Sequence, residues 1–477
     1  MPTDGMHGLV GLDFGTTTSS ALVAQARVRR NASSGRMELA DFRETYRSEL
    51  EFTPLNGELL DLAAAERLLD RWLSAAAVDP ADLLGGGALL TGLAAQRANA
   101  AGLVAAIRRR LGNTLVATAD DPCLESWLAF QGSCAALSRR HPEKWFIHID
   151  IGGGTANFAL GRDGEVHATG CLLVGARHVR VEPGTHRITG LSLQAATVLP
   201  SLGIHPTLGA QLSAEEVGRI AAWSANQIVH AATGESVGGA DPRAAASVQV
   251  PFLPPLSSSQ RQAAVITLSG GVGELVYAAA AGRQLPPTTA FGDLGIELAG
   301  RLHDHAAWRP FWTEFIPDGG GRATVAGLLQ HTTRISGTSL HLPDANLLPL
   351  ADLPIVGTLR PDLADDALRH LLDLARRSTT GAGLRIEGLG TSAEAVRQCG
   401  ERLAACLVAT GFPADRPLVL LLESNAGKAL GQCATRWGRV AVKLLVIDEL
   451  DLPDARYAAI GRLRDGVVPV SFHGLRK

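Results

Sequence analysis

Lysine is almost absent from this chain of 477 residues, which has four lysines against 40 arginines. We attribute this bias to genome composition, because acidic residues offset the arginines and leave a net charge of −3. A chain without a basic surplus gives no electrostatic case for binding nucleic acid or an anionic membrane. It also lacks an apolar run of about 18 residues and a basic segment followed by an apolar one after Met1. We therefore expect no membrane span, no signal peptide and a cytoplasmic location.

The six cysteines are scattered, and no two of them form a C-x-x-C pair. This spacing predicts buried free thiols, and it disfavours both a zinc site and a disulfide framework. Cys399 and Cys406 would lie on one face of a helix and pack in the core. His303, Asp304 and His305 are adjacent, so their side chains point in different directions, which disfavours a metal site there.

A short pattern, D-x-G-x-x-T, occurs twice, as LDFGTTT at residues 12–18 and as IDIGGGT at residues 149–155. Apolar runs that are typical of buried strands precede both aspartates, at residues 9–14 and 145–151. A turn of small residues and a second alternating strand follow each aspartate. The sequence therefore predicts the same β-hairpin twice, with a carboxylate at its mouth.

Such turns suit phosphate oxygens, because glycine lets backbone N–H groups approach a ligand and threonine adds hydroxyl donors. An aspartate beside phosphates can hold Mg²⁺ through water or orient an attacking water. Two facing copies would clamp one nucleotide. A third turn, SGGVGE at residues 269–274, joins an apolar strand to a helix, as expected where backbone lies against a nucleoside. The predicted nucleotide-binding residues are Gly15, Thr16, Thr17, Thr18, Gly152, Gly153, Gly154, Thr155, Ser269, Gly270, Gly271, Gly273 and Glu274.

The length exceeds what one hydrophobic core supports, and 46% hydrophobic with 19% charged residues is typical of a globular protein. We predict an α/β fold in three parts. Residues 1–144 and 145–335 follow the same plan, in which a meander of strands precedes alternating helices and strands, and residues 336–477 form a further α/β module. Residues 251–260, rich in proline and serine, are expected to be a connector. Residues 324–327 are expected to form a strand and turn that close the second part.

This arrangement resembles the actin, Hsp70 and sugar-kinase superfamily of ATPases. The resemblance implies two duplicated actin-like, ribonuclease H-like domains around an interdomain nucleotide cleft. Asp13 and Asp150 would lie in its two phosphate motifs, as catalytic residues and as Mg²⁺ partners through water. Asp121, before Pro122, lies where the superfamily has its first connecting helix, and it is the third predicted catalytic residue. Residues 324–327 resemble the second connection.

Within that superfamily, the chain is similar to the EutA family of ethanolamine ammonia-lyase reactivating factors over nearly its whole length. The motifs that carry this resemblance are LES at residues 124–126, IHIDIGGGTAN at 147–157, CLLVG at 171–175, TLSGGVGE at 267–274, GKALG at 427–431, VIDE at 446–449 and VVPV at 467–470. Three residues depart from the family pattern. Leu93 stands where the family has glutamate, and Leu328 and Leu329 replace an Ala-Gly pair at the second connection, where they could alter domain closure.

The family resemblance implies a chaperone that uses ATP, ADP and Mg²⁺ to release damaged cobalamin from ethanolamine ammonia-lyase. The chain contains no D-x-H-x-x-G cobalamin-binding pattern. We therefore expect it to act on cobalamin held by the lyase and to hold none tightly itself. Two alternatives stay open: a small-molecule kinase of the same superfamily, and a nucleotide-gated scaffold with negligible turnover. The sequence also leaves open whether the chain forms homo-oligomers and whether it joins an ethanolamine-utilisation microcompartment.

Overall fold

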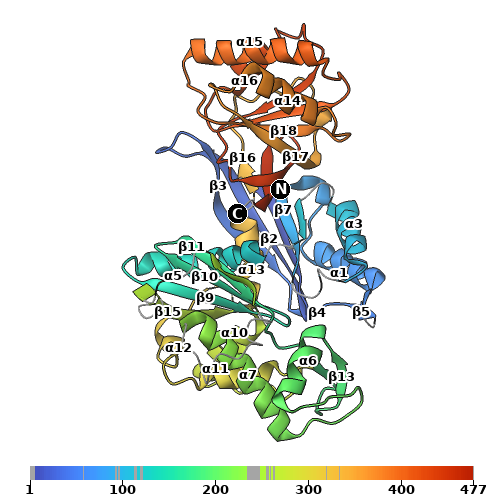
Figure 1. Cartoon of the computed structure of the whole chain (residues 1–477), viewed down its shortest axis with the longest axis vertical. Coiled ribbons are helices and arrows are strands. Elements are labelled where there is room, and N and C mark those ends of the chain that lie inside the picture. The colour runs from blue at the N-terminus through green and yellow to red at the C-terminus, as the bar shows by residue number, and fades with distance from the viewer. Residues whose placement is uncertain are drawn as a thin grey trace.

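Three large β-sheets organise the chain along its long axis (Figure 1). The computed structural model describes residues 6–56, 59–91, 94, 97–111, 115–118, 122–233, 248–253, 257, 259–260, 264–318, 320–331 and 333–475. The N-terminal sheet lies in the middle of the molecule, with the second sheet on one side and the C-terminal sheet on the other. In the described part of the chain, no helix combines the length and the apolar character needed to cross a membrane.

The first sheet has the order β3-β2-β1-β7-β8, and β4 also pairs with β2. Its strands are β1 (Met6–Phe14), β2 (Thr18–Arg30), β3 (Met37–Arg47), β4 (Glu51–Phe52), β7 (Leu83–Leu90) and β8 (Leu115–Thr118). Helices α1 (Leu62–Ala75) and α3 (Ala100–Leu111) cover the face that carries Val10, Leu12 and Phe14. The strands β5 (Leu55–Asn56) and β6 (Leu59–Leu60) form a small separate hairpin.

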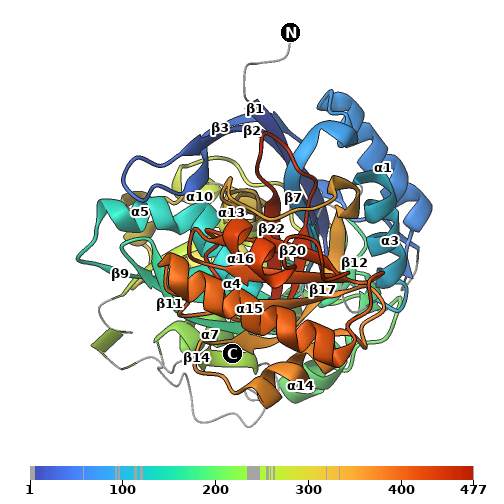
Figure 2. The same ribbon diagram turned by 90° about the horizontal axis from the view of Figure 1, so that it is seen from above.

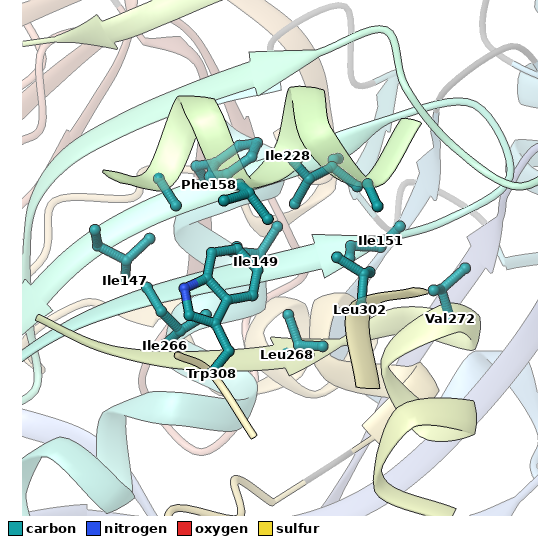
Figure 3. Packing of buried hydrophobic residues seen from close by; sticks show 14 of the residues in the cluster. Ile147, Ile149, Ile151, Phe158, Ile228, Ile266, Leu268, Val272, Leu302 and Trp308 are labelled. Atoms are coloured by element: carbon teal, nitrogen blue, oxygen red, sulfur yellow. The ribbon is translucent and has the colours of Figure 1, made fainter. Parts of the chain in front are cut away.

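The second sheet has the order β14-β11-β10-β9-β15. Its strands are β9 (Trp145–Ile151), β10 (Ala156–Arg162), β11 (Glu165–Leu172), β14 (Val248–Leu253) and β15 (Ala264–Ser269). The helices on it are α7 (Ala214–Thr233), α10 (Gly270–Ala280), α11 (Gly295–His303) and α12 (Phe311–Glu314), and β12 (Val179–Val181), β13 (Ile188–Leu191) and α6 (Leu193–Val198) form a side lobe. Figure 3 shows Ile147, Ile149 and Ile151 of β9 packed with Trp308 in the largest core cluster. The prediction of a connector at residues 251–260 is wrong for its first part, because β14 extends to Leu253 and pairs with β11.

The two hairpins have the same register. Asp13 pairs with Ser20 across β1 and β2, and Asp150 pairs with Asn157 across β9 and β10. Each turn is closed by one hydrogen bond of 3.0 Å, from the Gly15 N–H to the Thr18 carbonyl in the first copy and from Gly152 to Thr155 in the second. The duplicated α/β plan predicted from the sequence is confirmed.

Two helical connections cross between the duplicated units. The first comprises α4 (Pro122–Ala129), the π-helical segment η2 (Phe130–Cys134) and α5 (Ala135–Arg140), and α4 packs on β10 and β11 of the second sheet. The second is α13 (Ala323–His331), which packs back on β1 and β7 of the first sheet. The prediction of a strand and turn at residues 324–327 is therefore wrong.

Glycines allow α13 to lie this close to its neighbours. A Cβ atom on Gly327 would lie 2.1 Å from the Leu128 carbonyl oxygen of α4, so only glycine fits there. Leu328 and Leu329 are buried against strand positions where Gly87 and Gly11 lack side chains. The bulk of the two leucines is thus accommodated by the first sheet.

The C-terminal sheet has the order β16-β22-β21-β17-β18-β19-β20, and β17 to β20 run parallel. Its strands are β16 (Thr333–Ile335), β17 (Leu350–Leu359), β18 (Ala382–Ile386), β19 (Pro417–Leu422), β20 (Lys443–Ile447), β21 (Ala455–Ile460) and β22 (Pro469–Leu475). In Figure 2, the helices α14 (Asp365–Ala375), α15 (Ala393–Thr410) and α16 (Gly427–Ala434) lie over this sheet on the viewer's side. The six cysteines are free thiols, but the predicted burial holds only for Cys134, Cys171 and Cys406, because Cys123, Cys399 and Cys433 are partly exposed.

Candidate nucleotide site between the two hairpins

The two Gly- and Thr-rich turns touch each other. A Cβ atom on Gly153 would lie 2.1 Å from the Thr17 hydroxyl oxygen and 3.2 Å from Thr16 Cβ, so the second turn needs glycine at this position. A cavity of about 560 Å³ opens beside this contact. That volume lies within the range of small-molecule sites. Thr17 and Gly153 therefore place both hairpin tips at one cavity.

Asp13 lies at the end of β1 and accepts two side-chain hydrogen bonds. The Thr91 hydroxyl donates to Oδ1 over 3.1 Å, and the Thr324 hydroxyl of α13 donates to Oδ2 over 3.0 Å. The pKa of Asp13 is raised from 3.8 to about 7, chiefly by burial and also by the nearby charge of Asp150, while the two hydroxyl hydrogen bonds oppose the rise. The carboxylate is thus held in position by both the first sheet and the second connection.

Asp150 has the corresponding place at the end of β9. The Ser269 hydroxyl donates to its Oδ1 over 2.5 Å, because Ser269 pairs with Asp150 across the parallel strands β15 and β9. Burial raises the pKa of Asp150 from 3.8 to about 6. Both aspartates are therefore carboxylates that burial makes harder to ionise and that a nearby cation would stabilise.

A chain of buried hydrogen bonds supports Ser269 from behind. His148 Nε2 lies 2.9 Å from the Ser269 hydroxyl, and its Nδ1 lies 2.9 Å from the Thr267 hydroxyl. Burial lowers the pKa of His148 to about 3, so the ring is neutral and carries one N–H. Because the single Ser269 proton goes to ionised Asp150, the N–H must be on Nε2, and Nδ1 accepts from Thr267. The Thr267 oxygen can then accept the Cys134 thiol proton, 3.4 Å away between heavy atoms.

Glu125 of α4 is a third buried carboxyl group, on which the charges of Asp13 and Asp150 act. It is 7% exposed, and burial raises its pKa well above 4.5. The charges of Asp150 and Asp13 raise this pKa further, whereas a hydrogen bond from Asn157 lowers it. Sequence reasoning used Glu125 only within the LES motif and gave it no chemical role, because the crossing of α4 to the second sheet is a tertiary feature. Asp121, the residue it nominated instead, lies outside the described residues.

Large apolar side chains also line the cavity. Phe52, Phe291 and Ile316 are between about a third and just over half exposed, and Phe52 of β4 pairs with Thr18 of the first turn. The Arg177 guanidinium lies 5.7 Å from the centre of the Phe52 ring and donates to the Phe291 carbonyl over 3.2 Å. No sequence motif indicated these residues, because they come from three separate segments.

The third turn borders the same cavity. Gly270 has a positive φ of 76°, and a Cβ atom there would lie 2.5 Å from the Ile151 carbonyl oxygen. Gly271 has no heavy atom within 4 Å of its Cβ position and faces the cavity. Of the residues predicted from the sequence, those that line the cavity are Thr17, Thr18, Gly152, Gly153, Gly271 and Glu274. The others shape the turns beneath it: Gly15, Thr16, Gly154, Thr155, Ser269, Gly270 and Gly273.

Comparison with known proteins agrees with the motifs found in the sequence. A family model described as ethanolamine utilisation protein EutA matches residues 8–476. The chain belongs to the EutA family. Two curated EutA proteins, both named ethanolamine ammonia-lyase reactivase, come from Salmonella typhimurium strain LT2 and Escherichia coli strain K12. They are 31% and 30% identical to this EutA family member, and each match covers 98% of this chain and 97% of the relative.

Solved structures also resemble this EutA family member. A PPX-GPPA enzyme from Aquifex aeolicus has 14% identity and a TM-score of 0.37, and the match covers 68% of this chain and 99% of that chain. An exopolyphosphatase from Cytophaga hutchinsonii has 13% identity and a TM-score of 0.32, over 92% of this chain and 93% of that chain.

Proposed function

We propose that this protein hydrolyses ATP to reactivate ethanolamine ammonia-lyase, releasing damaged cobalamin from the inactivated enzyme. The observation that carries the ATPase part is the contact between two hairpins of identical register at one cavity, each with an aspartate at its base, partly buried in the first copy and buried in the second. The name shared by the curated relatives, ethanolamine ammonia-lyase reactivase, supports the choice of partner.

The residues present fit Mg²⁺ with a nucleotide. Asp13 and Asp150 offer carboxylates whose pKa values burial has raised, and the buried Thr17 hydroxyl has no hydrogen-bond partner among the described residues. Within those residues, no group of three or more His, Cys, Asp and Glu side chains is arranged to hold a metal ion. We therefore propose that Asp13 and Asp150 hold the ion through water. Bound Mg²⁺ would supply positive charge to the phosphate oxygens.

Glu125 is our candidate for the group that orients and deprotonates the attacking water. Its raised pKa makes it a stronger base than an exposed glutamate, and it lies close enough to both aspartates for their charges to act on it. Asp121 precedes the same helix and stays a prediction for this role. We assign the turns around Gly15 and Gly152 to the phosphates, and Gly271, which faces the cavity, to the nucleoside.

Hydrolysis would be coupled to the partner through the hinge between the units. ATP can contact both hairpins, whereas ADP lacks the γ-phosphate and loses contacts to one of them, which favours a more open cleft. Helices α13 and α4 pack closely where Gly327 lies against Leu128, and this contact links the two units. We expect the units to rotate about it when the cleft opens. We propose that the ADP form binds the lyase more tightly and that ATP rebinding frees the complex.

The experiment uses ethanolamine ammonia-lyase loaded with a cobalamin that lacks the adenosyl group. With Mg²⁺ and ATP, the wild-type protein should release this cobalamin, whereas ADP alone or the Asp150→Asn variant should not complete the cycle. ATP turnover measured with and without inactivated lyase separates the alternatives. Turnover that needs a small-molecule acceptor and ignores the lyase would favour a kinase, and partner binding without turnover would favour a scaffold.

A further inference from the structure

Two motifs of the C-terminal module that the nucleotide site does not use lie side by side. GKALG, at residues 427–431, begins α16 after strand β19, and VIDE, at residues 446–449, ends the neighbouring parallel strand β20. The Gly427 N–H donates to Asp448 Oδ2 over 2.9 Å. Asp448 is fully buried and Glu449 is 8% exposed, so both carboxyl groups lie inside the protein at the ends of parallel strands.

Hydrogen-bond donors are too few in this cluster. The Ser339 hydroxyl oxygen lies 2.5 Å from Asp448 Oδ2 and 2.6 Å from Asn425 Oδ1, yet serine has a single hydroxyl proton. Turning the Asn425 amide over would place its NH₂ group against Ser339, but its oxygen would then lie 2.6 Å from Glu449 Oε1. Either orientation leaves one short contact between two oxygens with no hydrogen between them, provided that both carboxyl groups are ionised. A bound positive charge would stabilise these oxygens.

Two carboxylate oxygens in the same place have no partner. Asp448 Oδ1 and Glu449 Oε2 are buried and make no hydrogen bond within the described part of the chain. A Cβ atom on Gly337 would lie 2.8 Å from the first oxygen and 2.3 Å from the second, so both oxygens lie close together against this glycine. An ionised carboxylate inside a protein is costly unless hydrogen bonds or positive charge compensate it, and these two oxygens have neither within the described part of the chain.

We propose that these oxygens form a binding site for a hard divalent cation, Mg²⁺ or Ca²⁺, separate from the nucleotide cleft. Asp448 Oδ1 and Glu449 Oε2 supply the charged ligands, and Ser339 and Asn425 position the two carboxylates through their contacts with Asp448 Oδ2 and Glu449 Oε1. Carboxylate oxygens suit these two ions, whereas zinc and copper favour imidazole and thiolate ligands.

The site lies beneath the contact between the first unit and the C-terminal module. Arg36, in the turn between β2 and β3, pairs with Asp451 over 2.7 Å and donates to the Glu423 carbonyl over 3.4 Å. Arg30 of β2 donates to the Thr338 hydroxyl over 3.4 Å. Cation binding orders the loops that contact the β2–β3 hairpin. Because β2 begins at Thr18 of the first phosphate turn, this hairpin connects the cation site to the nucleotide site.

The test is calorimetric titration of the nucleotide-free, full-length protein with CaCl₂ and, separately, with MgCl₂. We expect about one ion per chain at this site, with a dissociation constant in the range of protein cation sites, about 10⁻⁷ to 10⁻⁴ M. The salt that binds more tightly identifies the ion. Glu449→Gln should weaken binding at least tenfold. The matched control is Glu423→Gln, an exposed carboxylate in the neighbouring loop, which should leave the affinity unchanged.

A second control separates this site from the cleft. The double variant Asp13→Asn, Asp150→Asn removes the aspartates of the nucleotide site and should keep the C-terminal ion. Loss of binding in that variant, equal affinity in Glu449→Gln, or no binding of either ion would overturn the proposal. If Glu449→Gln does not fold, the variant Asn425→Ala, at an exposed position, should still weaken binding. The melting temperature gives a further test. If it rises in Glu449→Gln and does not change with CaCl₂ or MgCl₂, a proton bridges the carboxylates, and this result too would overturn the proposal.

Discussion

Replacing Asp13 by asparagine should make the nucleotide-free protein more stable, because the carboxylate is held where ionisation is unfavourable. Its pKa in the folded protein is about 7, against 3.8 for the free side chain. Below pH 3.8 the carboxyl group is protonated in both the folded and the unfolded protein, so its raised pKa does not change the free energy of unfolding. As pH rises from 3.8 to about 7, the unfolded protein ionises first, and the free energy of unfolding falls. At that pH this ionisation cost is about 4 kcal/mol.

Asparagine avoids this cost but has only one acceptor oxygen. Of the hydroxyl hydrogen bonds from Thr91 and Thr324, one is lost, which removes about 1 kcal/mol. We therefore expect Asp13→Asn to increase the free energy of unfolding by about 3 kcal/mol at neutral pH and to lower it slightly near pH 4, where the lost hydrogen bond outweighs the small ionisation cost. The same variant should lower ATP turnover by about 10² because the charge beside the phosphates is lost.

Urea denaturation of the nucleotide-free protein at several pH values between 4 and 8 measures this difference, from the midpoints of variant and wild type. Asp362→Asn is the matched control, because Asp362 is exposed and has no described partner. An unchanged or lower midpoint for Asp13→Asn at neutral pH would refute the reasoning, as would a gain that persists at pH 4.

Three further expectations concern the cleft. Glu125→Gln should lower kcat by about 10² to 10⁴ with little change in KM, measured by phosphate release; an unchanged kcat would remove Glu125 from the chemistry. Gly271→Val should abolish nucleotide binding in a calorimetric titration while the fold persists, because its Cβ position is open to the cavity, whereas Gly270→Val should destabilise the fold through Ile151. In nitrogen-15 spectra of histidine-labelled protein, His148 should stay neutral from pH 5 to 8, and its proton should be on Nε2 above about pH 6, where Asp150 is ionised. Its signal is assigned by loss in His148→Asn, and a titration near 6.5 would contradict the hydrogen-bond chain.

The sequence by itself determined the two hairpins and the aspartate at the base of each. Their strands were predictable because an apolar run, a turn of small residues and a second alternating run are local patterns, and hairpin register follows from turn length. The closing hydrogen bonds at Gly15 and Gly152 have the same geometry in both copies for this reason. Membership of the EutA family could likewise be predicted from the sequence, because the motifs of the family are contiguous stretches of residues.

Only the tertiary structure decided which other groups share the cleft. The charges of both aspartates act on Glu125 because α4 crosses from the first sheet to the second, and no local pattern encodes that crossing. Residues 324–327 resemble a strand and turn through their β-branched residues and glycine, yet they form a helix because Leu328 and Leu329 find space over Gly87 and Gly11. Secondary structure there follows the packing partner and not the local propensity. The tertiary structure likewise decided which groups surround the carboxylates of VIDE. Gly427 and Ser339 reach Asp448 only when the parallel strands are assembled.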